Sequence, residues 1–323
     1  MKIAIVGATG AVGRTMLRVL KERKLPFDDI YLFSSARSAG TVLDGHTVEE
    51  LTPQSFDRGI DIALFAASGS NSKEYCPIAA KNGCVAIDNS SAWRMNPDVP
   101  LVVPEVNPQD IFKHKGIISN PNCSTIQAMV ALAPLHKAYG IKRVIYSTYQ
   151  SVSGAGNNGI ADLERTARGE APQQFLRPIA GNCLPHIDSF ADDGYTLEEL
   201  KMINETRKIL HAPEMQITAT TVRVPVAIGH SESINITFEK DFDISELRDI
   251  LENAPGLVVQ DDVENNIYPT PLECAGSDDV FVGRIRRDLS AANSLNMWVV
   301  ADNVRKGAAT NAVQIAEELI KGK

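Results

Sequence analysis

Hydrophobic residues in the first part of the chain alternate between strand and helix patterns. Residues 3–6 form a continuous apolar run, and apolar residues then recur at helical spacing over 16–20. Further strands are predicted at 30–33, 61–67 and 84–88, and a further helix at 72–82. Strands that alternate with helices predict a parallel sheet with helices packed on its faces.

The first predicted strand leads directly into a glycine turn, Gly7-Ala8-Thr9-Gly10-Ala11-Val12-Gly13. A strand, a glycine turn and a helix in this order are the context that a dinucleotide fingerprint requires, here in the GxxGxxG variant. Gly7 permits the tight turn, Gly10 lets the backbone approach a pyrophosphate, and Gly13 permits close packing of helix on strand. The phosphates are expected at the N-terminus of the following helix.

The residues after the second predicted strand indicate which dinucleotide binds. NAD enzymes usually carry an acidic residue there, which accepts the ribose 2′-hydroxyl. This chain has Ser34-Ser35-Ala36-Arg37-Ser38 instead, and its hydroxyls and guanidinium suit a 2′-phosphate. We therefore predict NADP; the alternative is a polar loop with a solvated arginine.

Cys123 follows the turn Asn120-Pro121-Asn122, between a strand that ends near 119 and a helix whose apolar residues begin at Ile126. Unpaired N–H groups and the positive end of the dipole gather at a helix N-terminus and favour a thiolate. A thiolate there could attack a carbonyl or acyl carbon. The alternative is a buried, inert cysteine, and this stretch alone does not decide between them.

The pattern becomes rich in strands after this helix. Strands are predicted at 142–149, 217–226, 234–238, 281–286 and 295–300, and helices at 198–210 and 308–320. Residues 151–156 read as a flexible small-residue loop, and 157–177 as helical and then irregular. Residues 229–233 read as a Gly-Ser loop whose His230 is a candidate general acid or base, although a lone histidine is more often structural.

Three charged side chains add candidate binding chemistry. Arg94 lies in a loop after the strand at 84–88, where it could clamp a phosphate or a carboxylate, or simply be a surface arginine. Glu205 and Lys208 lie one turn apart on one helix face, which is also the spacing of an ordinary surface ion pair.

Composition limits the class of protein. The 323 residues suggest about two domains, and 44% hydrophobic and 22% charged residues are ordinary for a soluble globular protein. The net charge of -8, without a basic run, argues against nucleic-acid binding. Five scattered cysteines fit a reducing compartment and offer no metal spacing. Without a signal-peptide or membrane-spanning pattern, we expect a cytoplasmic protein that does not bind membranes.

Taken together, the motifs resemble the aspartate-β-semialdehyde dehydrogenase family over essentially the whole chain. They are GATGAVG (7–13), SARSAG (35–40), PLVVPEVN (100–107), NPNCSTIQ (120–127), STYQSVSGAG (147–156), RVPV (223–226), GHSES (229–233) and FVGRIRRDLS (281–290). The resemblance implies an α/β fold with a Rossmann-type doubly wound NADP-binding domain over 1–122 and 303–323. It implies an α+β catalytic and dimerisation domain with a mixed sheet over 123–302.

The implied reaction is NADPH-dependent reductive dephosphorylation of L-aspartyl-4-phosphate to L-aspartate-4-semialdehyde and phosphate. It would proceed through a cysteine thioester, in the biosynthesis of lysine, methionine, threonine and isoleucine. The implied assembly is a homodimer, which could pair further into a tetramer.

The resemblance also assigns roles to individual residues. The catalytic residues would be the nucleophile Cys123, the acid/base His230 and Gln150, which orients the substrate. Substrate and phosphate contacts would come from Arg94, Asn122, Glu205, Lys208 and Arg223. Cofactor contacts would come from Gly7, Thr9, Gly10, Ala11, Val12, Ser35, Arg37, Ser38, Ser153, Gly154 and Asn303.

Two alternatives remain. The first is another acyl-phosphate reductase such as N-acetyl-glutamyl-phosphate reductase, which typically has Gly before the cysteine and an aromatic residue after it, where this chain has Asn122 and Ser124. The second is a non-catalytic NADP-binding paralogue, which predicts loss of a catalytic Cys, His or Gln. The chain is short for the family around 170–182, so the structure of that segment stays open.

Overall fold

The computed structural model describes residues 1–322, which form two compact units. Unit 1 comprises Met1–Asn122 and Ala308–Lys323, and unit 2 comprises Cys123–Gly307. The chain therefore leaves unit 1 at Asn122 and returns to it for the last helix.

Unit 1 contains a seven-stranded sheet in the order β3-β4-β2-β1-β5-β6-β7. All neighbouring pairs are parallel except β3 with β4. The strands are β1 (Lys2–Val6), β2 (Asp29–Ser34), β3 (Val42–Leu43), β4 (His46–Glu50), β5 (Ile62–Phe65), β6 (Val85–Asp88) and β7 (Ile117–Ser119). The α-helices are α1 (Ala11–Glu22), α2 (Gly69–Lys81) and α8 (Asn311–Lys321), and the 3-10 helices are η1 (Ala36–Ser38), η2 (Pro53–Phe56) and η3 (Pro108–Lys113).

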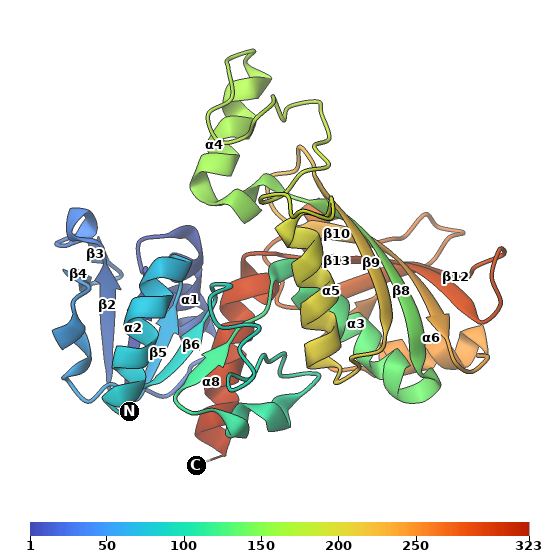
Figure 1. Cartoon of the computed structure of the whole chain (residues 1–323). Helices are drawn as coiled ribbons and strands as arrows, with labels where there is room; N and C mark the ends of the chain where they lie inside the picture. The colour runs from blue at the N-terminus through green and yellow to red at the C-terminus, as the bar shows by residue number, and fades with distance from the viewer. Residues whose placement is uncertain (323) are drawn as a thin grey trace. The chain divides into compact units, whose positions relative to one another are not determined.

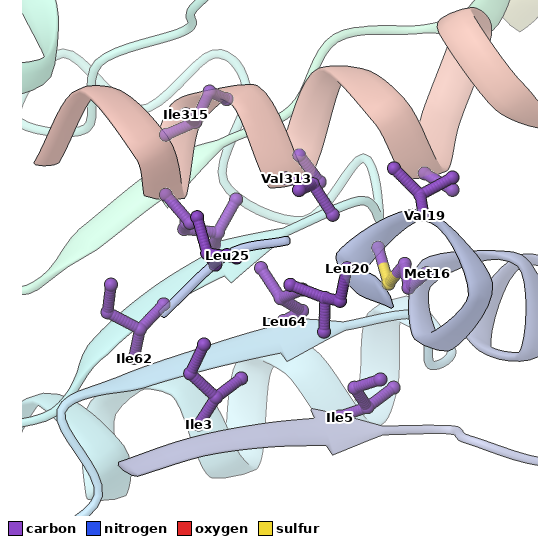
Figure 2. Close-up of a cluster of buried hydrophobic side chains, with 14 of the residues drawn as sticks. Ile3, Ile5, Met16, Val19, Leu20, Leu25, Ile62, Leu64, Val313 and Ile315 are labelled. Carbon is purple, nitrogen blue, oxygen red and sulfur yellow. The ribbon is translucent and has the colours of Figure 1, made fainter. Parts of the chain in front are cut away.

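Helices cover both faces of this sheet because the central strands are apolar on both sides. Ile3 and Ile5 of β1 point into a cluster with Leu20 of α1 and Val313 of α8 (Figure 2). The alternate residues of β1 point to the opposite face, where they pack with Cys76 of α2. This is a doubly wound α/β arrangement, which confirms the predicted Rossmann-type fold.

Unit 2 contains a six-stranded mixed sheet in the order β11-β12-β13-β10-β8-β9. Strands β8, β9, β10, β12 and β13 are labelled in Figure 1. The β8–β9 and β11–β12 pairs are parallel and the others antiparallel. Its strands are β8 (Ile141–Gln150), β9 (Gln216–Arg223), β10 (His230–Phe238), β11 (Leu257–Val259), β12 (Val280–Arg287) and β13 (Ser294–Ala301). Its helices are α3 (Cys123–Tyr139), η4 (Val152–Ala155), α4 (Gly156–Ala167), α5 (Leu197–Ile209), α6 (Ile244–Glu252) and α7 (Pro271–Cys274), and a π-helix, η5 (Arg305–Thr310), leads into α8.

Helix α3 is the centre of unit 2. It packs on β8, β10, β12 and β13 and on helices α5 and α6. Its residues 124–132 are all buried, which is expected of a helix enclosed on every side. The other face of the sheet carries partly or well exposed side chains, including Tyr149, Ser233, Asn235 and Trp298.

Two local predictions in this unit were wrong. His230 does not lie in a loop: it is the first residue of β10, paired with Ala301, and it is fully buried. Residues 151–156 are not a flexible loop either, because 152–155 form the 3-10 helix η4, whose first N–H groups donate to Val226 and Ala227. Both segments have polar sequences whose side chains are nevertheless largely buried, so polarity wrongly suggested exposure.

Several short elements were not predicted. Strands β3, β4 and β11 and helix α6 lack a long periodic pattern, and α2 begins at Gly69, earlier than the expected 72. Ser68 caps α2 by accepting from the Asn71 N–H, and Asp243 caps α6 by accepting from two N–H groups. These capping residues were the available sequence signals for both helix starts.

Candidate functional site

The glycine turn of unit 1 is shaped to admit an anion. Gly7 has φ +82°, and a Cβ there would lie 2.3 Å from the Ala66 carbonyl oxygen. A Cβ on Gly13 would lie 2.3 Å from the Gly7 carbonyl oxygen, whereas Gly10 is exposed and has no such clash. Gly10 is the N-cap of α1, the first turn contains no acidic residue, and Ala11 and Val12 begin the helix. The residues present therefore fit a dinucleotide pyrophosphate, which the free N–H groups can bind.

Hydroxyl groups cluster where β2 ends. Thr9 Oγ1 lies 2.8 Å from Ser34 Oγ and donates to Ser38 Oγ at 3.4 Å. Ser35 and Arg37 are exposed beside them, and Arg37 lies in η1. The end of β2 thus carries several hydroxyl groups and the exposed guanidinium of Arg37 next to the glycine turn.

Arg94 is a buried residue of unit 1 rather than a surface arginine. Its exposure is 8%, its Nε donates to the Asn120 carbonyl at 3.0 Å, and its Nη2 donates to the Asn89 carbonyl at 2.7 Å. Asn120 is fixed in turn, because it accepts from Asn311 Nδ2 at 2.7 Å. The guanidinium is therefore held against the turn that continues through the buried Asn122 to Cys123.

Cys123 is the first residue of α3 and is half-buried. Gly307 packs closely against it, since a Cβ on Gly307 would lie 3.0 Å from Cys123 Cβ and would require a small shift. By contrast, burial raises the pKa of Cys84 and of Cys274 to about 12, and that of Cys76 still further. Burial thus holds these three thiols in the protonated, unreactive form.

Gln150 ends β8 next to the cysteine turn. Its amide Nε2 donates to Ser124 Oγ at 2.8 Å and to Glu198 Oε1 at 3.0 Å. The Thr148 hydroxyl donates to Gln150 Oε1 at 3.4 Å. The side chain, 1% exposed, is therefore fixed in one orientation beside the residue that follows Cys123.

His230 approaches α3 from β10. Gln127, in the second turn of α3, donates to the His230 carbonyl at 3.3 Å. His230 Nδ1 accepts the Ser151 N–H at 3.0 Å, and since a backbone N–H can only donate, we assign the ring proton to Nε2. Nε2 has no hydrogen-bond partner among the described residues, so its N–H is available to a bound ligand. Burial, aided by the charge of Arg223, lowers the pKa of His230 to about 3, and the ring is neutral at pH 7.

Arg223 ends β9 beside this histidine and beside Gly154. Its Nη1 donates to the Ser151 carbonyl at 2.7 Å. A Cβ on Gly154 would lie 2.7 Å from Nη1 and 3.4 Å from His230 Nε2, so Gly154 borders both groups. Burial lowers the pKa of Arg223, and the charges of Glu198 and Cys123 oppose that shift. The structure thus places Cys123, Arg223, His230 and Gln150 around one region of unit 2.

Other predicted site residues lie in the same unit. Glu205 on α5 is 1% exposed, and Lys208, one turn further, is half-buried, so the pair is not an ordinary surface ion pair. Asn303 Oδ1 accepts from the hydroxyls of Ser151 and Ser153 and from the Gly229 N–H, at 2.9 to 3.1 Å. The Oδ1 atom of Asn303 is therefore engaged within the protein, so a side-chain contact with a cofactor would fall to its Nδ2 group.

Two residues of this region, Glu198 and Ser151, were not predicted from the sequence. Glu198, 5% exposed, holds Gln150 and also accepts from Lys201 at 3.0 Å. Ser151 supplies the N–H that fixes the His230 tautomer. A capping box at Thr196 and Glu199 marks the start of α5 and could have located Glu198, whereas only the three-dimensional structure shows the role of a backbone N–H.

Residues 1–322 contain neither a metal-binding cluster nor a membrane-spanning helix. No group of three or more His, Cys, Asp and Glu side chains is arranged to hold a metal ion. None of the helices is long and apolar enough to cross a bilayer.

Two family models match the chain. Residues 2–114 match "Semialdehyde dehydrogenase, NAD binding domain", and residues 132–306 match "Semialdehyde dehydrogenase, dimerisation domain". The fold and these matches define a two-domain semialdehyde dehydrogenase with a dinucleotide-binding domain.

Relatives that match over the full length of the chain show which kind of semialdehyde dehydrogenase it resembles. The aspartate-semialdehyde dehydrogenase of Aquifex aeolicus (strain VF5) is 57% identical over 333 residues, covering 99% of this chain and 98% of the relative. That of Bacillus subtilis (strain 168) is 49% identical over 339 residues, with 99% and 98% covered. The chain belongs to the aspartate-semialdehyde dehydrogenase family, which confirms the resemblance and makes it an oxidoreductase of amino-acid biosynthesis.

Solved structures share the fold over the whole chain. Aspartate semialdehyde dehydrogenase II of Vibrio cholerae, complexed with ASA, matches with a TM-score of 0.94 and 47% identity, covering 99% of this chain and 98% of that one. The enzyme of Candida albicans, with NADP, matches with a TM-score of 0.78 and 26% identity, with the same coverage.

The neutral, buried His230 predicts how stability depends on pH. Its folded pKa of about 3 lies below the ordinary value of 6.5, so between these pH values the unfolded state binds more protons. The contribution of His230 to the free energy of unfolding is fully present above pH 6.5 and is lost as the pH falls toward 3. Glu232, whose pKa burial raises, has the opposite effect, so the test compares two proteins rather than two pH values.

Between pH 6.5 and 5, wild type should lose about 1 to 2 kcal/mol more free energy of unfolding than His230→Gln. Urea denaturation at a series of pH values measures this difference, and the two curves should run parallel above pH 7. Equal losses on acidification would show that His230 is not held neutral.

Proposed function

We propose that the chain catalyses NADPH-dependent reductive dephosphorylation of L-aspartyl-4-phosphate to L-aspartate-4-semialdehyde and phosphate. The step would serve lysine, methionine, threonine and isoleucine biosynthesis in the cytoplasm. The observation that carries the proposal is Cys123 at the N-terminus of α3, with Gln150, His230 and Arg223 fixed around it.

The proposed chemistry begins at the sulfur of Cys123. The helix N-terminus and the Arg223 charge favour a thiolate, whose Sγ attacks the acyl carbon. A C–S bond forms, the bond from carbon to the phosphate oxygen breaks, and phosphate leaves with the electron pair. The product is a thioester, which accepts a hydride far more readily than a carboxylate does.

Bound NADPH would supply that hydride. The resulting thiohemiacetal oxyanion then expels the Cys123 thiolate and releases the aldehyde, so the nucleophile is regenerated. The one proton that the overall reaction consumes is taken up by the departing phosphate. The Nε2–H of His230 is available to stabilise the oxyanion at each tetrahedral stage. To accept the thiol proton at Nε2, the neutral ring would first need its proton on Nδ1, and that tautomer is disfavoured because the Nδ1 proton would face the Ser151 N–H.

The remaining charged residues suit the ends of the substrate. We assign the substrate carboxylate to Arg223, whose planar guanidinium can bind it bidentately, and the ammonium group to Glu205. We assign the phosphate to Arg94 and Lys208, with Asn122 beside the nucleophile. Gln150 would orient the acyl group, since Ser124 and Glu198 fix its amide.

We infer NADP rather than NAD as the cofactor. The proposal is supported by the exposed Arg37 and by the hydroxyls of Thr9, Ser34 and Ser38 at the end of β2. The remaining proposed contacts are those of the glycine turn, Ser35, Ser153, Gly154 and Asn303.

We also propose that two copies pair through the face of the unit 2 sheet that lies opposite α3, here called the open face. This face carries Ile145 and the aromatic pair Tyr149 and Trp298, whose ring centroids are 5.4 Å apart. Exposed aromatic and apolar groups on a sheet are typical of an interface, and the matching family model is described as a dimerisation domain. A tetramer would require a second surface.

Replacing Cys123 tests covalent catalysis. Cys123→Ala should lower phosphate-dependent NADPH formation from aspartate semialdehyde by at least about 10³-fold, because no thioester can form. NADPH affinity, measured by fluorescence titration, should stay within about twofold, since most of the proposed cofactor contacts belong to unit 1. The exposed Cys183 is the matched control, and Cys183→Ala should leave activity unchanged. Normal turnover of Cys123→Ala would exclude this mechanism.

Replacing Arg37 tests cofactor choice. Arg37→Ala should raise the KM for NADPH about 10-fold or more, because it removes a charge-assisted contact with the 2′-phosphate. The KM for NADH should hardly change. Arg18→Ala, which removes an exposed cation of α1, is the control. Equal effects on both dinucleotides would contradict the assignment.

Placing a charge on the open sheet face tests the dimer. Ile145→Asp should shift the mass measured by light scattering from dimer toward monomer, because the buried carboxylate would lack a partner. Val42→Asp, at a position of unit 1 that is 62% exposed, should remain dimeric. A wild-type monomer, or an unchanged dimer in Ile145→Asp, would rule out this face.

A further inference from the structure

An aromatic ring from the segment after α4 lies against Arg223. The Phe175 ring centroid is 5.9 Å from Arg223 Cζ, within the range of a cation–π contact. The guanidinium donates one hydrogen bond within the described residues, from Nη1 to the Ser151 carbonyl. With an exposure of only 6%, Arg223 is largely withdrawn from water, and few protein groups hold its charged end.

Asp162 on α4 fixes the segment that carries Phe175. Its carboxylate accepts the N–H groups of three consecutive residues, Gln173 at 2.7 Å and Gln174 and Phe175 at 3.0 Å. Burial alone would raise the pKa of Asp162, but these N–H groups outweigh it and lower that pKa. Asp162 is 1% exposed and ionised, so it serves as an internal anchor for the segment.

Apolar packing sets which side chain of this segment turns inward. Phe175 packs against a cluster of Val152, Ile179 and Leu184, whereas the adjacent Leu176 is 84% exposed. Leu184 also exchanges two backbone hydrogen bonds with Arg223, at 2.8 and 2.9 Å. The segment is therefore tied to Arg223 by a backbone pair as well as by the ring.

We propose that Phe175, held by Asp162, is a positioning residue that orients Arg223 for the substrate carboxylate. The inference rests on the proposed role of Arg223. The π face of the ring attracts the cation without taking up a conventional hydrogen bond, so the remaining N–H donors of Arg223 stay available to bind a carboxylate bidentately. The ring also excludes water from its side of the guanidinium, which strengthens the interaction with the anion.

Kinetics of Phe175→Leu test the proposal. The KM for aspartate semialdehyde should rise about 5- to 30-fold, because the guanidinium loses its cation–π contact. The KM values for NADP and for phosphate, and kcat, should stay within about threefold, which a general loss of structure would not allow. Phe175→Tyr keeps the ring face and should restore the wild-type KM, and Leu176→Ala is the matched control from the same segment.

A double-mutant cycle shows whether Phe175 acts through Arg223. Arg223→Lys keeps the charge but removes the planar face, so adding Phe175→Leu should then raise the KM by less than about twofold. Asp162→Asn, which weakens the anchor, should shift the KM in the same direction as Phe175→Leu but by less.

The outcomes distinguish failure of the proposed function from failure of the proposed role of Phe175. If wild type shows no phosphate-dependent oxidation of aspartate semialdehyde, the proposed function fails and this inference fails with it. If wild type is active but Phe175→Leu leaves the KM unchanged, or raises all three KM values equally, the inference alone is overturned. Additive effects in the cycle would likewise overturn it.

Discussion

The constraint that organises unit 2 is the burial of polar side chains around the first turns of α3. A buried donor or acceptor without a partner is costly, so burial favours hydrogen bonds between these side chains. Ser124 and Glu198 both accept from Gln150 Nε2, and Gln127 donates to the His230 carbonyl. The strand ends β8 and β10 are thereby fixed to the helix whose first residue is Cys123, and the geometry of the site follows from satisfying these groups.

The electrostatics of this region follow from the same burial. His230 is neutral because its ring is desolvated and faces Arg223, so it is better suited to donate from Nε2 than to hold a permanent positive charge. In the proposed mechanism, stabilisation of the Cys123 thiolate would then depend on the helix terminus and on Arg223. The site uses one fixed cation and one neutral donor, and each has its own position around the cysteine.

Much of this architecture could be predicted because it depends on local patterns. The glycine turn after β1, the apolar core strands and Cys123 at a strand-to-helix turn are encoded in contiguous residues. His230 was misplaced in a loop because its strand begins with His-Ser-Glu, residues that are buried only through contacts with distant segments. Glu198, Ser151 and Phe175 were missed for a related reason, since their partners Gln150, His230 and Arg223 lie many residues away.

The return of the chain to unit 1 has a consequence for biosynthesis on the ribosome. Unit 2 is inserted between β7 and α8, and α8 contributes Val313, Ile315 and Leu319 to the apolar cluster over β1 and β5 (Figure 2). During translation unit 2 emerges whole, whereas the nucleotide-binding sheet waits for its last helix with that apolar surface uncovered. The domain whose synthesis begins first is therefore the one completed last, and it is the one more exposed to aggregation before release.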